Sequence, residues 1–408
     1  MSMVLSAAAL MCALAWPAAA QVGQQEQQKP TYTIQEYNAF QACRAETNAQ
    51  TRVRCLDDFV AKFPNSTLMQ YAYVLYYTTY NELKNYPKTI EYADKVLGLG
   101  DRVDATTRLQ AIQARVQLFP YAFNPKAADA NDQLTKERDA ALLGAKLLDQ
   151  LPKPKESTDT DAQFADRKKP GIAFFDAAAG FADLQMKDDA SAVPAFKGAL
   201  SNNPNDAVSS YRLGLAYLEM NPPQSLDGFW ALARAVDQKV PDDSKVKDYL
   251  RKSILNYEQP SCDSVADAQV NELLQLAAAS PERPATYSIP TRADLDKIVQ
   301  ASNILTVLTD LKAGGDKAKM TWLALCGAEF PEVVGKVIDV APGTEFVELH
   351  LYTGATQEEV EKATTGNMDA RVVGQPEAGR PDVAGLGAEI IRRSASAGRS
   401  GTARAGRR

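Results

Sequence analysis

The strongest constraint on the fold is a recurring spacing of small and apolar residues. Ala192, Phe196, Ala199 and Pro204 follow one another at intervals of four, three and five residues. Related spacings occur at Ala140, Gly144, Leu147 and Pro152, at Thr89, Ala93 and Val96, and at Gly228, Leu232, Ala235 and Pro241. Intervals of three and four place residues on one helix face, and a following proline ends the helix. A repeated helical unit is therefore expected.

Two glycines indicate the length of this unit. Gly180 and Gly214 lie 34 residues apart, and the later one belongs to Leu213-Gly214-x-x-Tyr217. The period and this motif together resemble the tetratricopeptide repeat (TPR), whose first helix carries Leu-Gly-x-x-Tyr and whose second carries the small residues. The resemblance implies a mostly α chain built as a TPR-type α-α superhelix. A generic helical bundle with alanine-rich contacts is the alternative.

The repeats are unevenly spaced. Thr89 and Ala140 are 51 residues apart and Ala140 and Ala192 are 52 apart, which places insertions in 119–130 and 153–170. The family's large aromatic residue in the first helix is replaced by Ser210 in one repeat and by Asp176 in another, as the printed sequence shows. About four to five repeats are expected over residues 32–260.

Near the C-terminus the pattern changes from helical to strand-like. Residues 333–340 are β-branched and 346–352 alternate in polarity, and Pro342-Gly343 between them predicts a hairpin turn. A short helix beginning near 356 and a further strand at 370–373 are expected to follow. We interpret this part as a small β-rich module resembling a partly open barrel of oligonucleotide/oligosaccharide-binding (OB) type.

These patterns divide the chain into six regions. They are a signal peptide (1–20), a polar flexible segment (21–31), a TPR-like helical repeat domain (32–280), a linker with further helices (281–330), a small β-rich module (331–375) and a disordered Gly/Ala/Arg-rich tail (376–408). We interpret the tail as solvated, although its arginines also suit a nucleic-acid arm.

The first twenty residues resemble a secretory signal peptide. An apolar run, Val4–Trp16, precedes Ala18-x-Ala20, which is the order of a hydrophobic region and a cleavage site. We expect an exported protein, periplasmic or secreted, whose mature chain begins at Gln21. An uncleaved anchor is the alternative, but a bilayer span needs about 20 apolar residues.

Export would permit disulfides. Cys43 and Cys55 lie in two predicted helices separated by the polar turn Glu46–Asn48, and antiparallel packing would bring them together. A Cys43–Cys55 bond is expected. The pairing of Cys262 and Cys326 is left open.

Composition argues against an enzyme. Asp and Glu number 51 against 45 Lys and Arg, a net charge of −6, so the surface as a whole does not attract nucleic acid. The single histidine, His350, excludes multi-histidine metal sites, and residues 313–317 lack the spacing of a phosphate-binding loop. We expect no catalysis, no cofactor, no metal and no stable membrane span after cleavage.

The resemblance also implies candidate binding residues, because first helices line the concave groove of TPR proteins. The residues at the groove-facing positions are Tyr71, Val74, Thr78, Asn81, Phe181, Tyr211 and Leu215. This mixture of aromatic and polar side chains suits peptide capture. Packing inside the core is the alternative at each position.

Three functions are compatible with these features. The first is a non-catalytic TPR scaffold that binds a protein or peptide in its groove. The second is an accessory subunit of an envelope-assembly complex that docks by its convex face and C-terminal module, because Phe63-Pro64-Asn65-Ser66 resembles helix ends in bacterial envelope repeat proteins. The third is a carbohydrate-active enzyme with a site in the C-terminal module.

Overall fold

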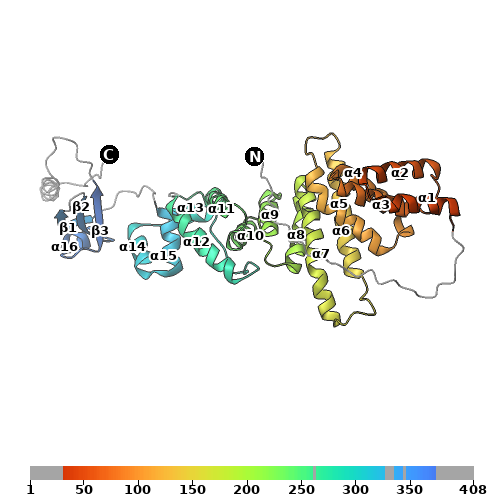
Figure 1. Ribbon diagram of the computed structural model, residues 1–408. Helices are drawn as coiled ribbons and strands as arrows, with labels where there is room; N and C mark the ends of the chain where they lie inside the picture. Colours follow the sequence, from red (N-terminus) through yellow and green to blue (C-terminus); the bar gives the residue numbers. More distant parts are fainter. Residues whose placement is uncertain (1–30, 261–262, 327–334, 343–345, 374–408) are drawn as a thin grey trace. The chain divides into compact units, whose positions relative to one another are not determined.

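The computed structural model describes residues 31–260, 263–326, 335–342 and 346–373 (Figure 1). The chain falls into two compact units, Met1–Ala122 and Phe123–Arg408. This boundary lies inside the helical region 32–280 expected from the sequence. The predicted signal peptide and the tail 376–408 lie outside the described residues.

The first unit consists of consecutive helices joined by short turns. They are α1 (Ile34–Ala45), α2 (Ala49–Lys62), α3 (Met69–Glu82), α4 (Tyr86–Leu97), the 3₁₀ turn η1 (Gly100–Arg102) and α5 (Ala105–Ala122). Local sequence explains the starts: Thr33 and Glu36 form a reciprocal capping box on α1, and the side chains of Asn48 and Asn85 cap α2 and α4.

The first unit has a disulfide across its first helical hairpin. Cys43 on α1 and Cys55 on α2 are bonded, with their Cα atoms 5.3 Å apart. The hairpin turn is Glu46–Asn48, as the sequence predicted. Cys43 is almost fully buried beside Phe40 and Phe59, so the bond belongs to the apolar core of α1–α3.

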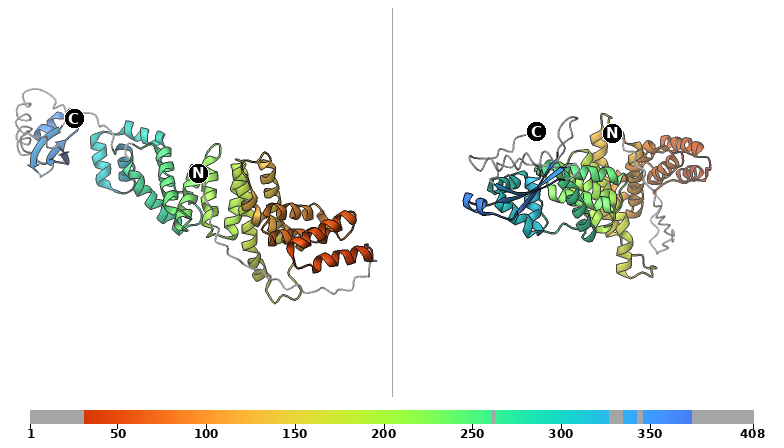
Figure 2. Two further views of the ribbon diagram at one scale, coloured as in Figure 1. Left: turned by 45° about the horizontal axis from the view of Figure 1, so that its top comes forward. Right: turned by 90° about the vertical axis from the view of Figure 1, so that its left-hand side faces the viewer.

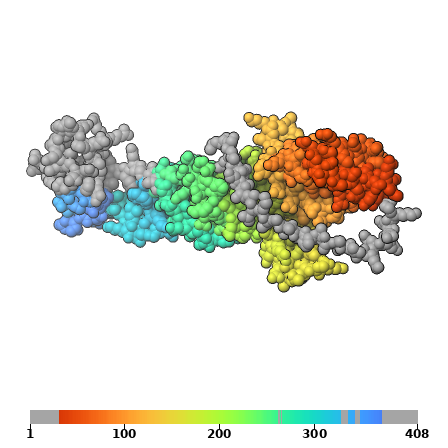
Figure 3. Space-filling model, in the orientation of Figure 1, coloured from red at the N-terminus to blue at the C-terminus, as the bar shows by residue number. Residues whose placement is uncertain are grey.

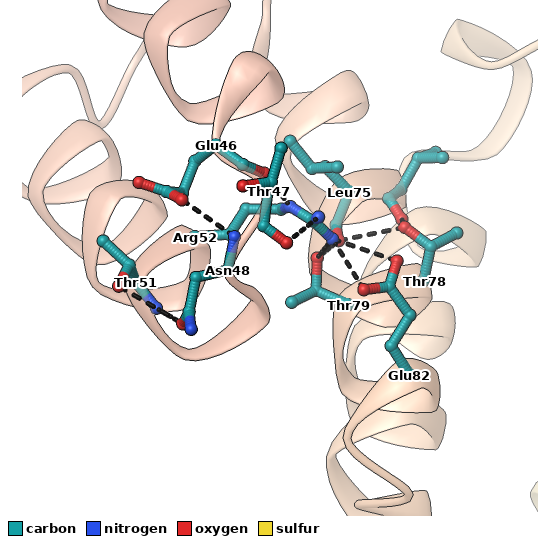
Figure 4. A network of polar contacts seen from close by, with 10 residues as sticks. Glu46, Thr47, Asn48, Thr51, Arg52, Leu75, Thr78, Thr79 and Glu82 are labelled. Atoms are coloured by element: carbon teal, nitrogen blue, oxygen red, sulfur yellow. Dashed lines mark hydrogen bonds and ion pairs between the residues drawn. The ribbon is translucent and has the colours of Figure 1, made fainter.

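Arg52 holds this turn against α3. Its Nε donates to the carbonyl of Glu46 at 2.8 Å, and its Nη1 reaches Glu82 Oε2 at 3.0 Å and Thr79 Oγ1 at 3.2 Å (Figure 4). Thr79 is completely buried. The network therefore fixes one helical hairpin on the next through a charge that is satisfied by several acceptors.

The second unit begins with a long helical hairpin and continues with shorter helices. The helices are α6 (Ala130–Gln150), α7 (Asp161–Gln185), α8 (Asp189–Asn202), α9 (Ala207–Glu219), α10 (Ser225–Asp237), α11 (Asp243–Glu258), α12 (Ser264–Ala279), α13 (Arg292–Ala301), α14 (Ile304–Ala313) and α15 (Gly315–Leu325). Figure 2 shows α6 and α7 side by side.

Much of the predicted insertion 153–170 is helical. Residues 161–170 form the first turns of α7, which has 25 residues against 14 in α8. At 1.5 Å per residue the two helices are about 37 Å and about 21 Å long, so α7 extends past α8. This end of the hairpin, coloured yellow, projects in the space-filling view (Figure 3). The extra residues thus lengthen a hairpin instead of forming a long loop.

The spaced small residues form the buried face of the helices that carry them. Ala192, Phe196 and Ala199 on α8 have no exposed surface. A Cβ atom added to Gly180 of α7 would lie 2.9 Å from Phe196 Cε1. Small residues on one helix therefore accommodate a large residue on the other, which is the packing that the sequence pattern predicts.

The predicted linker 281–290 packs against α10. Arg283 Nε donates to Asp227 Oδ1 at 2.7 Å, and the ring of Tyr287 meets that of Trp230 edge-on at 5.4 Å. Ile289 joins the apolar core of α10–α12. This segment is consequently part of the helical unit.

The β-rich part is a three-stranded antiparallel sheet in the order β1-β2-β3. Its elements are β1 (Gly335–Pro342), β2 (Phe346–Thr353), α16 (Gln357–Lys362) and β3 (Met368–Val373). His350 on β2 lies opposite Asp369 on β3, with 2.6 Å between Nδ1 and Oδ1. The fold is therefore mostly α with a small C-terminal β module, as predicted.

Candidate functional site

The four predicted groove residues of the first unit all lie on α3, but only two of them are exposed. Tyr71 is 53% exposed and packs at a tilt on Phe40, and Asn81 is exposed near the helix end. Val74 is half-buried in the core of α3–α5, and Thr78 Oγ1 donates to the carbonyl of Val74 at 3.0 Å. The contacts of Val74 therefore fit a residue packed in the core better than a residue that lines a groove.

Asn81 borders an open hollow between α3 and α5. The hollow has a volume of about 210 Å³, and it is lined by Asn81 of α3 and by Gln110, Gln113, Ala114, Gln117 and Leu118 of α5. Four of these six residues carry side-chain amides. The structure thus joins one predicted residue to three glutamines that sequence reasoning missed.

The amides of the hollow have no hydrogen-bond partner among the described residues. All four of these side chains are exposed, and none of their amide groups makes a hydrogen bond with another described residue. Each amide offers two N–H donors and one carbonyl acceptor. The hollow can therefore donate and accept hydrogen bonds without attracting charge of either sign.

The alignment of the three glutamines on one face of α5 follows from helix geometry. Gln110, Gln113 and Gln117 are three and four residues apart on α5, so they share one face. Residues on other faces of the helix, such as Ile112 and Val116, are buried. The polar stripe was readable in the sequence, but its position beside α3 was not.

In the second unit, the predicted residues lie on α7 and α9. Phe181 on α7 lies beneath the guanidinium of Arg212, whose Cζ is 4.6 Å from the ring centroid. Tyr211 is half-buried and packs against the core of α10–α12, and Leu215 is half-buried. Of the three, Phe181 thus contacts a charged group that sequence reasoning had not singled out.

Among the described residues of the second unit, three carboxyl groups have strongly raised pKa values. Burial raises the pKa of Asp176 to about 6, that of Asp183 to about 6 and that of Glu258 to about 7. A catalytic pair would require one carboxyl to act on another. None of these three carboxyls acts on another. Asp183 lies 3.8 Å from Arg138, and Asp188 and Asp139 add to the rise of its pKa. Glu258 accepts from Gln269 at 2.7 Å.

Metal-binding clusters and membrane-spanning helices are absent from the described residues. Within residues 31–260, 263–326, 335–342 and 346–373, no group of three or more His, Cys, Asp or Glu side chains is arranged to hold a metal ion. No helix in this described part combines the length and apolarity that crossing a membrane requires. Cys326 is disulfide-bonded, whereas Cys262 lies outside the described residues.

Comparisons with known proteins assign no function to the chain, so its function is inferred from the geometry of the candidate sites. No protein-family model matches the chain, and no curated protein matches it significantly.

Proposed function

We propose that this protein is a non-catalytic TPR-type scaffold of the cell envelope or secreted space that binds an extended protein or peptide segment. The observation that carries the proposal is the set of four amides around the hollow between α3 and α5 that have no hydrogen-bond partner among the described residues. Main-chain peptide groups are the ligands that such amides match, because every residue except proline offers one N–H and one C=O.

The dimensions of the amide stripe suit an extended chain. From Gln110 to Gln117 the axis of α5 advances by about 10 Å. An extended peptide covers that distance in about three residues, at roughly 3.3–3.6 Å per residue. One short segment could therefore contact all three glutamines, while Asn81 approaches it from α3.

The hollow is a poor match for a small-molecule site. Sites for small ligands usually enclose about 300–1,000 Å³ with mostly apolar walls. The present hollow is smaller, open and lined largely by amides, at about 210 Å³. These properties favour a polymer that extends beyond the hollow and gains affinity from neighbouring surface.

The accessory-subunit function is the second candidate, and exposed apolar residues near the end of the helical part favour it. Trp322 on α15 is 55% exposed, and Leu311 on the adjacent helix α14 is 38% exposed. Large exposed apolar side chains are typical of protein contacts. Docking at α14–α15 would need no contribution from the amides of α5.

The proposal is tested with peptides selected from a displayed random library against the whole protein. Replacing both Gln113 and Gln117 with alanine should weaken binding of the selected peptides roughly thirtyfold, because each of the two lost hydrogen bonds contributes about 1 kcal/mol. The matched control replaces Gln35 and Gln50, two exposed glutamines of α1 and α2, and should bind normally. Equal binding by both double variants would exclude the amide hollow as the site.

A further inference from the structure

Arg212 has no acidic partner among the described residues. No carboxylate of the described residues forms an ion pair with it, and no hydrogen bond to its side chain is present among them. Its nearest acidic influence is Asp206, whose carboxylate is engaged in capping α9, where it accepts from the backbone N–H groups of Val208 and Ser209. No described carboxylate is therefore paired directly with this charge.

Partial burial makes the positive charge of Arg212 energetically unfavourable in the absence of an anionic partner. The side chain is half-buried between α7 and α9, and burial lowers the pKa of its guanidinium. The nitrogen atoms of its guanidinium remain accessible to solvent. A ligand can therefore reach a cation whose hydration is already reduced, which strengthens its attraction to an anion.

Phe181 sets the orientation of this cation. The guanidinium lies over the ring at 4.6 Å, a distance at which stacking and cation–π attraction hold the planar group in place. A guanidinium fixed on one face presents its N–H groups at the edge. Such an edge matches the two oxygens of a carboxylate.

Two further aromatic side chains of the second unit are exposed, on α7 and α11. Phe174, two turns before Phe181 on the same face of α7, is 41% exposed, and Tyr249 of α11 is 39% exposed. Tyr249 lies close enough to Tyr211, the neighbour of Arg212, to influence it electrostatically. These exposed rings suit apolar residues that flank a carboxylate within a chain, which favours an internal acidic residue over a chain end.

We propose that the surface formed by Phe174, Phe181, Arg212 and Tyr249 binds an extended segment of a partner protein through an internal Glu or Asp side chain flanked by apolar residues. Arg212 holds the carboxylate, and the aromatic rings cover the flanking residues. This site belongs to the second unit and does not depend on the amide hollow of α3 and α5.

The probes are two degenerate mixtures of nonapeptides, acetylated and amidated, with either Glu or Gln fixed at the centre. Binding is followed on the full chain by the Nε–Hε resonance of Arg212, which is identified by its absence from the Arg212→Lys variant. We expect the Glu mixture to shift this resonance at a concentration roughly tenfold or more below that of the Gln mixture, as for a hydrogen bond to a charged group.

Two variants separate this site from general charge attraction. Arg212→Gln should abolish the preference for Glu in a pull-down of the same mixtures. Lys197→Gln removes one positive charge from an exposed position of α8 and should retain the preference. Circular dichroism of both variants establishes that they are folded, and Arg212→Lys, which keeps the charge, should retain part of the preference.

Several results of these experiments would overturn the proposal. Equal binding of the Glu and Gln mixtures, or a preference that survives Arg212→Gln, overturns the proposal. A third mixture with a central Gln and a free C-terminal carboxylate reports a chain-end site, and binding of this mixture alone would also overturn it. The preference should persist in the Gln113→Ala/Gln117→Ala variant, so failure of the amide hollow and failure of this site give different results.

Discussion

Gly214 on α9 and Gly228 on α10 face each other where these two helices approach closely. A Cβ atom on Gly214 would lie 3.1 Å from the carbonyl oxygen of Gly228, and one on Gly228 would lie 3.2 Å from that of Gly214. Leu232 closes the same contact, with its Cγ 2.7 Å from the Cβ position of Gly214. Backbone atoms cannot rotate away as a flexible side chain can.

Replacing Gly214 with valine should therefore destabilise the second unit by about 1–3 kcal/mol or more, through overpacking. Thermal unfolding followed by circular dichroism measures the change. Gly98→Ala is the control, because the nearest atom to a Cβ there is 3.4 Å away and its backbone is helical. Similar melting temperatures for the two variants would contradict the close helix approach.

Asp176 should make stability depend on pH. Burial raises the pKa of its carboxyl to about 6 in the folded protein from the ordinary 3.8, so the folded state holds the proton more tightly. Stability is then highest below the ordinary pKa and falls as the pH rises toward about 6. Above that pH, Asp176→Asn should unfold at higher urea concentration than the native sequence.

The difference between Asp176→Asn and the native sequence should shrink as the pH is lowered to about 4, where the native carboxyl is protonated. Asp149→Asn, at an exposed position of α6, serves as the control and should leave the urea midpoint nearly unchanged at both pH values. A constant difference across the range would show that Asp176 acts through packing instead of ionisation.

The Cys43–Cys55 bond should stabilise the first unit. It closes a loop with a sequence separation of 12, and the loop entropy model gives about 3 kcal/mol or less for so short a loop. Replacing both cysteines with serine should lower the urea midpoint of α1–α5. Reductant should lower the midpoint of α1–α5 in the native protein to a similar degree, and it should leave the midpoint of α1–α5 in the double variant unchanged, because the remaining disulfide, at Cys326, lies in the second unit.

Sequence patterns predicted the elements well because their signals are local. The β-branched run at 333–340 and the alternation at 346–352 predicted β1 and β2, and the buried face of α8 follows the spacing of Ala192, Phe196 and Ala199. Within a helix or strand, the periodicity of side chains is fixed by backbone geometry alone.

The candidate sites were less predictable because they depend on pairs of helices. Phe181 was chosen from its register, but Arg212 was missed, since nothing local distinguishes it from an arginine with an acidic partner. Gln113 and Gln117 were missed because exposed glutamines on a helix are ordinary until another helix supplies Asn81. In both candidate sites, the neighbouring residues come from helices that are far apart in the sequence.

The most direct test of the central claim is to locate a bound peptide. A peptide selected on the Arg212→Gln variant of the whole protein, which lacks the acidic-residue site, is given a photoreactive benzophenone and irradiated in complex. The crosslinked residues are identified by mass spectrometry. The account predicts crosslinks concentrated on residues 110–118 of α5 and around Asn81, with few at Gln35 or Gln50. Crosslinks centred on Trp322 and Leu311 instead would contradict peptide binding at the amide hollow and would favour docking through α14–α15.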